Sequence, residues 1–452
     1  MNSSESFLSS LQSSQLLRLL AIGVLALLLQ IPISMIAGLV TERQARRAEA
    51  VEDVTSKWGR TQQLTGPVLV VPYVHRWMET NSRGAPITRE EPRHAVFLPD
   101  QLDVKGELDS ESRQRGIFSV PVYELSLVLS GVFRAPDLVA LGIDPKTVDW
   151  KHVHLALGIS DVRAVRGQNP LTWRSGDVEL LPGTGSFACG AGIHARVDAS
   201  GATPLTFSLP LALAGSIGAY FTPFGRETTV ALTSNAKSPS FQGSWLPTER
   251  NVSSDGFRAS WSIPFLGRGF PQAWTSKSDV GDSIAAARFG VDLLEPVDHY
   301  RMAERSVKYA GLFILWTFSA VWLVEVLARV RVHPIQYLLI GAALCVFYVL
   351  ELSLAEHLGF ATAYALASAA VISLIGTYAR AILGRTRRAL VVTGGAAALY
   401  AYLYVVLTNE DYALLAGSLG LLAVVAGIMF VTRRVDWYQL GAPRPSHVEP
   451  LA

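Results

Sequence analysis

The side chains with the clearest chemical potential lie inside a long apolar run. Residues 331–360 read RVHPIQYLLIGAALCVFYVLELSLAEHLGF, and one acid, Glu351, stands within the apolar portion. An ionised carboxylate inside a membrane is costly, and such residues usually face the interior of a helical bundle. Glu351 is therefore a candidate for a proton or ion relay. Two structural alternatives stay open: the side chain reaches toward the outer headgroups, or it pairs with His357.

Polar residues at the two ends of this run complete the candidate set. Glu356 and His357 stand together at its far end, and His333 stands just before it. We treat these three, together with Glu351, as candidate functional residues. Glu325, in the preceding apolar run, lies four residues before Arg329. That spacing predicts an i,i+4 ion pair at the membrane interface.

The polar part of the chain offers weaker chemistry. His152 and His154 would lie on one face of a strand, as in some metal sites, but no third ligand follows at a fitting spacing. The glycine-rich stretch 182–192, PGTGSFACGAG, lacks the GK[ST] ending of a P-loop and predicts a tightly turned loop. Cys189 within it has no identifiable base. We therefore expect no catalytic residue, no metal site and no cofactor.

The apolar runs predict helices that cross a membrane. Half of the 452 residues are hydrophobic, 17% are charged, and the mean hydropathy is +0.30. Soluble domains carry about 25% charged residues. A bilayer core about 30 Å thick needs roughly 20 apolar residues in a helix. Six runs meet that length: residues 19–40, 307–328, 335–354, 360–379, 389–408 and 412–432.

Arginines between the runs predict the orientation, because cytoplasmic loops carry the excess of Lys and Arg. They follow the second, fourth and sixth runs: Arg329, Arg331, Arg380, Arg385, Arg387, Arg388, Arg433 and Arg434. Arg43, Arg46 and Arg47 follow the first run and fit this orientation less well. The expected order is a cytoplasmic N-terminus (1–18), a first transmembrane helix (19–40), a periplasmic domain (41–306), a five-helix bundle (307–432) and a cytoplasmic tail (433–452).

The insert between the first and second runs predicts a mainly β domain. Residues 68–74, 117–133 and 205–213 are rich in β-branched and aromatic residues, and Gly, Pro, Ser and Asp separate such segments. Residues 41–57 predict a polar helix that continues out of the membrane. The fold class is therefore a polytopic α-helical membrane protein with six transmembrane helices. A large, predominantly β extracytoplasmic domain is inserted after the first of them.

Several long strings resemble the CreD family, inner-membrane proteins of Gram-negative bacteria. They are LTGPVLVVP (64–72), PGTG (182–185), LTSN (232–235), PSFQGSWLP (239–247), HPIQYLLIG (333–341), EHLGF (356–360) and FVTRRVDWY (430–438). The resemblance implies the bacterial inner membrane, a part in cell-envelope integrity, and expression linked to a two-component stress response. It implies no catalytic residues. Glu356 and His357 belong to the matching strings, whereas Glu351 does not.

Two functions remain open at this point. The first is a non-enzymatic envelope protein whose periplasmic domain binds an envelope component or a partner protein, while the bundle anchors it in the lipid bilayer. The alternative is a transporter or channel that uses the bundle with Glu351, Glu356 and His357. A net charge of +2 and the lack of a basic, aromatic patch argue against nucleic-acid binding. The sequence does not predict the oligomeric state.

Overall fold

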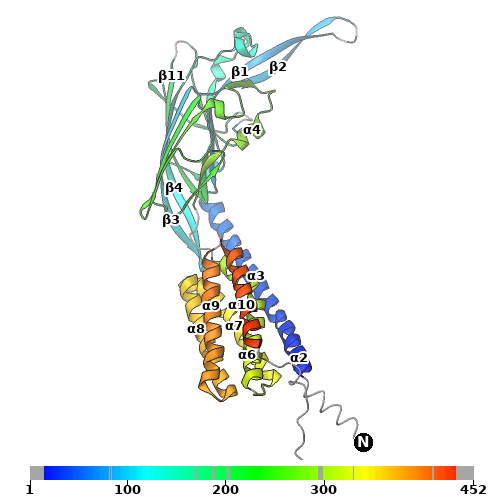
Figure 1. Ribbon diagram of the computed structural model, residues 1–452. Helices are drawn as coiled ribbons and strands as arrows, with labels where there is room; N and C mark the ends of the chain where they lie inside the picture. The colour runs from blue at the N-terminus through cyan, green and yellow to red at the C-terminus, as the bar shows by residue number, and fades with distance from the viewer. Residues whose placement is uncertain are drawn as a thin grey trace, which may run out of the picture. The chain divides into compact units, whose positions relative to one another are not determined.

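The computed structural model describes residues 15–80, 82, 84–167, 170–185, 189–200, 204–293, 299–328, 330–409 and 412–433. The described chain forms two compact units. The β unit comprises residues 48–296, and the helical unit comprises residues up to 47 and from 297 onward. Figure 1 shows these two kinds of structure along one chain. Most of the expected terminal segments 1–18 and 433–452 lies outside the described residues.

The helical unit contains one broken N-terminal helix and a bundle. Its elements are α2 (Gln15–Leu28), α3 (Gln30–Trp58, which ends in the β unit), α5 (His299–Lys308), α6 (Ala310–Ala328), α7 (Pro334–Leu358), α8 (Phe360–Leu383), α9 (Thr386–Thr408) and α10 (Ala413–Thr432). The N-terminal helix is interrupted at Leu29, one turn before Ile33, and Pro32 between these residues has no backbone N–H to donate.

Short connections join the helices of the bundle, so helices that follow one another in sequence are neighbours.

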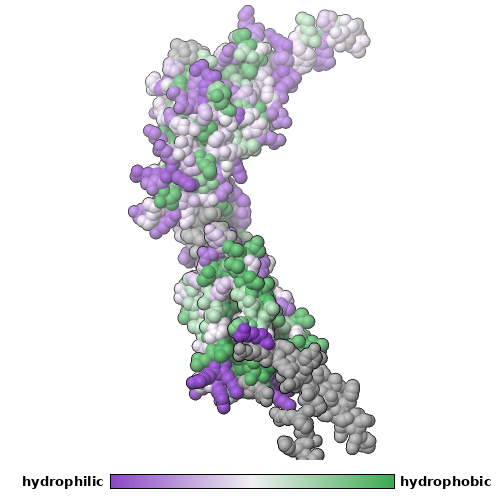
Figure 2. All heavy atoms as spheres, in the orientation of Figure 1, coloured by the Kyte–Doolittle hydropathy of each residue, from purple (hydrophilic) through white to green (hydrophobic). Residues whose placement is uncertain are grey.

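Five of the described helical stretches are long and apolar enough to cross a bilayer. They are Arg18–Trp58, Ala310–Leu327, Pro334–Leu358, Phe360–Leu383 and Thr386–Thr408. Figure 2 shows hydrophobic residues over the surface of the helical unit, as lipid contact requires. The expectation of a membrane protein with an N-terminal span and a large β insert is confirmed. The sixth span expected over 412–432 coincides with α10 and stays a prediction.

Small residues let the bundle helices approach closely. A Cβ atom added at Gly341 of α7 would lie 2.1 Å from Leu29 Cδ1 and 3.1 Å from Phe318 Cζ of α6. One added at Gly376 of α8 would lie 2.9 Å from Thr393 Oγ1 of α9. Because lipid gives helices no hydrophobic reason to associate, such close packing supplies much of the attraction between them.

The β unit is a sandwich of two mixed sheets. Sheet A has the order β14-β18-β12-β1-β5-β10-β9, with β2 on β1 and β17 on β2; sheet B has the order β15-β16-β13-β3-β4-β11-β7-β8, with β6 on β11. The strands of sheet A are β1 (Gln62–Thr80), β2 (Pro86–Phe97), β5 (His154–Ile159), β9 (Leu181–Pro182), β10 (Gly192–Arg196), β12 (Gly218–Phe221), β14 (Pro239–Gly243), β17 (Ala273–Thr275) and β18 (Phe289–Leu293). The strands of sheet B are β3 (Gln101–Arg115), β4 (Phe118–Phe133), β6 (Val165–Arg166), β7 (Leu171–Trp173), β8 (Gly176–Val178), β11 (Leu205–Ser216), β13 (Glu227–Ser234), β15 (Glu249–Ser253) and β16 (Gly256–Pro264). The short helix α4 (Gly281–Ala286) precedes β18.

Alternation along the strands builds a single core between the sheets. On β4, Leu125, Leu127 and Leu129 are buried, while Ser126 and Val128 between them face outward. Trp261, one of the largest fully buried side chains, is 1% exposed, and its ring is tilted against that of Phe289 with ring centroids 5.6 Å apart. Its indole nitrogen donates to the Trp245 carbonyl at 3.2 Å, so the ring is buried without an orphaned donor.

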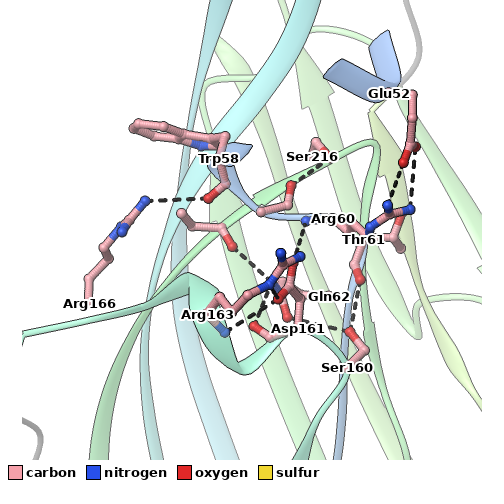
Figure 3. A network of polar contacts seen from close by, with 12 residues as sticks. Glu52, Trp58, Arg60, Thr61, Gln62, Ser160, Asp161, Arg163, Arg166 and Ser216 are labelled. Atoms are coloured by element: carbon pink, nitrogen blue, oxygen red, sulfur yellow. Dashed lines mark hydrogen bonds and ion pairs between the residues drawn. The ribbon is translucent and has the colours of Figure 1, made fainter. Parts of the chain in front are cut away.

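A polar network fastens the connection between α3 and β1 to β11 and to Asp161 (Figure 3). Gln62 is 1% exposed, and its amide nitrogen donates to the Ala214 carbonyl at 2.9 Å. The Ser216 hydroxyl donates to the Gly59 carbonyl at 2.8 Å. A Cβ atom added at Gly59 would lie 2.6 Å from Ala214 O, so the backbone approaches too closely there for any larger residue. Asp161 accepts from the Arg60 backbone N–H at 3.3 Å. The chain therefore leaves the helix along a path held by specific hydrogen bonds.

We predict that Gln62→Ala lowers the free energy of unfolding of the β unit by about 1–3 kcal/mol, because it leaves buried carbonyl groups without their donor. Urea unfolding of the full-length protein in detergent, followed by tryptophan fluorescence, measures this loss. Gln63→Ala, at the half-buried neighbouring position, is the control and should lose far less. Equal losses at the two positions would contradict a specific part for Gln62.

Candidate functional site

Glu351 lies in the interior of the helical unit with one direct hydrogen-bond partner. Its side chain on α7 is 1% exposed. The Ser306 hydroxyl, on α5 and itself 0% exposed, donates to Glu351 Oε2 at 2.8 Å. The other oxygen, Oε1, is buried and accepts no hydrogen bond from the described residues. Neither of the two structural alternatives for Glu351 is seen. Its side chain does not reach the surface, and its partner is Ser306 and not His357, which is exposed.

Aromatic residues from three helices surround this carboxyl group. The Tyr348 and Tyr400 hydroxyls are buried and also lack a hydrogen-bond partner in the described part of the chain. Tyr348 stands three residues before Glu351 on α7. Phe347 packs edge-on against Tyr400, with ring centroids 4.6 Å apart. The Tyr364 hydroxyl donates to the Tyr400 carbonyl at 2.7 Å. We call Glu351, Ser306, Tyr348 and Tyr400 the Glu351 cluster.

Glu356 is held from two other helices. The Tyr300 hydroxyl of α5 donates to Glu356 Oε1 at 3.0 Å, and Arg43 Nε of α3 lies 3.7 Å from the same oxygen. Its side chain is 10% exposed. Glu356 therefore links α3, α5 and α7, and these contacts give it a structural role in holding the three helices together. His357 beside it is exposed and does not join the Glu351 cluster.

His333 caps a helix. Its backbone is extended, with φ −77° and ψ 142°, and its Nδ1 accepts from the Ile335 backbone N–H at 3.3 Å. In return, the Gln336 side chain accepts from the His333 backbone N–H at 2.9 Å. This reciprocal pattern is a capping box, followed by Pro334 at the first helical position. The structure therefore gives His333 a local structural part at the start of α7.

Glu325 is paired with the N-terminal helix. Arg18 Nη1 lies 2.9 Å from Glu325 Oε1, and the Tyr337 hydroxyl donates to Oε2 at 2.9 Å. The partner expected from the sequence, Arg329, lies outside the described residues. Arg18 and Glu325 are 307 residues apart in the sequence, so no spacing between neighbouring residues could have predicted this pair.

The histidines and the cysteine of the β unit do not form a reactive site. His154 Nε2 lies 3.2 Å from the Thr184 carbonyl, and burial lowers the pKa of His154 below its usual range. Burial raises the pKa of Cys189 to about 12, so the thiolate needed for nucleophilic attack is scarce at neutral pH. The described residues contain no group of three or more His, Cys, Asp or Glu side chains arranged to hold a metal ion.

The outer face of sheet B is hollowed into a groove that the sequence analysis missed. Two adjoining hollows of about 760 and 810 Å³ share Glu107, Ser126, Thr233, Asn251 and Arg258. The outward positions between buried leucines and valines hold hydroxyl, charged and apolar side chains, among them Ser126, Lys105 and Val128, a mixture typical of an exposed sheet face. Figure 2 shows hydrophilic residues over much of the β unit. We call this feature the sheet B groove.

We predict that Arg18→Gln destabilises the helical unit by about 1–3 kcal/mol, because Glu325 is left buried with one donor. The thermal unfolding midpoint of the protein in detergent measures this, and the double variant Arg18→Gln/Glu325→Gln should recover most of the loss. The control is Arg46→Gln, whose partner Glu42 is exposed, and it should cost about 0–1 kcal/mol. Additive losses in the double variant would contradict the pairing.

Comparison with known proteins places the chain in a family. The family model described as "Inner membrane protein CreD" matches residues 14–438. The chain is 31% identical over 420 residues to the Inner membrane protein CreD of Escherichia coli (strain K12), covering 92% of each chain. A solved structure titled "Structure of yeast LTA4 hydrolase in complex with Bestatin" matches at 9% identity over 77% of this chain and 69% of that one, with a TM-score of 0.19. The chain belongs to the CreD family of inner membrane proteins.

Proposed function

We propose that this protein is a non-enzymatic component of the inner membrane that supports envelope integrity or the envelope stress response. In this proposal the β unit lies in the periplasm and binds an envelope component or a partner protein, while the helices anchor it. The observation that carries the proposal is the sheet B groove, an open hollow on a well-packed sandwich that charged, hydroxyl and apolar side chains line together. The buried, high-pKa thiol of Cys189 supports a binding function over nucleophilic catalysis.

The proposed orientation rests on charge between the helices. Arg385 in the turn between α8 and α9 and Arg433 after α10 favour the cytoplasm for these connections. The last turn of α7 carries Glu356 and His357, and neither it nor the connection to α8 at Gly359 contains Lys or Arg. This pattern supports cytoplasmic chain termini and a periplasmic β unit.

The groove offers a ligand both polar and apolar contacts. Short side chains, among them Ser126 and Ser260, line it together with Val128. Lys105, Glu107 and Arg258 border it, and none of these three forms an ion pair with another described residue. Charged groups of both signs that are not already paired can bind a partner with charge-assisted hydrogen bonds.

We predict that a photo-crosslinking amino acid in place of Ser126 or Ser260 captures a periplasmic protein or envelope fragment in living cells. The control position is Val139, which is 75% exposed and does not line the groove. Arg258→Glu should reduce the crosslinked yield about tenfold, the effect of losing about one charged contact. Capture of cytoplasmic proteins would contradict the orientation, and equal capture at Val139 would contradict the groove.

A transporter or channel is the second candidate function, favoured by the buried Glu351 Oε1 that accepts no hydrogen bond from the described residues. Glu356 gives it less support, because Tyr300 and Arg43 already hold that side chain.

If this second function is correct, we expect proteoliposomes with the wild-type protein to pass ions and those with Glu351→Gln to pass at least about tenfold fewer, because the charge in the bundle is lost. Ion-selective dye measurements follow the flux. An ion flux through proteoliposomes with the wild-type protein that equals the flux through protein-free vesicles would contradict this second function.

A further inference from the structure

The Glu351 cluster has more buried oxygen atoms than hydrogen bonds to satisfy them. Glu351 Oε1, the Tyr348 hydroxyl and the Tyr400 hydroxyl are all buried without a partner among the described residues. The three side chains are 1%, 2% and 2% exposed. Tyr348 stands three residues before Glu351 on α7, and Phe347 beside it packs against Tyr400 with ring centroids 4.6 Å apart, so the three side chains belong to one buried region. A buried polar atom without a partner is expensive, and three of them in one region point to a ligand.

The charges near the cluster do not neutralise Glu351. No described Lys, Arg or His forms an ion pair with it. Arg305, next to Ser306 on α5, donates to the Val406 and Leu407 carbonyls at the end of α9, at 3.1 and 3.2 Å. Ser306 contributes a neutral hydroxyl. An ionised Glu351 therefore needs one positive charge from outside the side chains described.

The donor atoms indicate which cation would fit. All of them are oxygens: one carboxylate and the hydroxyls of Ser306, Tyr348 and Tyr400, which suit hard cations. A single carboxylate neutralises one positive charge, so a divalent ion would leave net charge in the bundle. Soft transition metals would need sulfur or imidazole ligands.

We propose that the Glu351 cluster binds one alkali-metal cation, with Na⁺ as its probe. Glu351 Oε1 supplies the charge, and the hydroxyls of Tyr348 and Tyr400 supply further oxygen ligands. Ser306 holds Oε2 and so fixes the orientation of the carboxylate. Glu351 lies seven residues before Leu358, the last residue of α7, which is about 10 Å along the helix. This inference is independent of the function proposed for the β unit.

Thermal unfolding of the full-length protein in detergent tests the site. We expect the unfolding midpoint to rise and saturate with NaCl, relative to choline chloride at the same ionic strength, because a ligand that binds only the folded state stabilises it. Glu351→Gln should abolish the response. Tyr400→Phe should raise the half-saturating Na⁺ concentration about tenfold, the loss of one ligand. Glu356→Gln is the matched control and should keep the wild-type response.

Binding of radioactive sodium to the wild-type protein keeps the test independent of how well the variants fold. One Na⁺ bound per chain, displaced by unlabelled Na⁺ but not by choline, is the expected result. Equal midpoints for the wild-type protein in Li⁺, Na⁺, K⁺ and choline chloride would overturn the proposal. That result would assign a proton, and not a metal ion, as the partner of Glu351. A Glu351→Gln variant that responds to Na⁺ as the wild type does would also overturn it.

Discussion

Carboxylates inside the helical unit must each find a donor, and this requirement determines how its elements are fastened together. Charge in hydrocarbon is costly, so the helices can pack only in arrangements that bring a partner to each acid. Arg18 reaches Glu325, Tyr300 and Arg43 reach Glu356, and Ser306 reaches Glu351. Because van der Waals packing alone distinguishes helix orientations weakly in lipid, these few polar contacts select one arrangement.

The short helix α5 receives more of these contacts than its length would suggest. Tyr300 and Ser306 contact α7, Arg305 contacts the carbonyl end of α9, and Glu304 accepts from Gln44 of α3 at 3.3 Å. The sequence analysis assigned residues up to 306 to the β domain on polarity, yet α5 is part of the helical unit. Its polar side chains face carboxylates and helix ends of that unit, so polarity alone did not indicate which unit it joins.

The sequence was sufficient for features that depend on local pattern. Apolar length predicted the five helices that are long and apolar enough to cross a bilayer, alternation predicted the β class, and the long strings indicated the family, which the comparisons confirm. Contacts between distant residues could not be read in the same way. The partner of Glu325 was sought four residues away and is Arg18, and Ser306 gave no sign that it would reach Glu351. His333 was taken for a candidate functional residue, and its capping part was not predicted because histidine is an unusual helix cap. The sheet B groove went unnoticed because its mixture of hydroxyl, charged and apolar side chains looks like ordinary surface.

The ion pair between Arg18 and Glu325 has a consequence for biosynthesis. Its two members are 307 positions apart, and the whole β unit is encoded between them. At about 5–20 residues per second, a ribosome needs about 15–60 s to reach the second member after the first. During that interval the N-terminal helix must remain in the lipid without its acidic partner. Closure of the helical unit is therefore a late event on the ribosome, and the sandwich has time to fold before it.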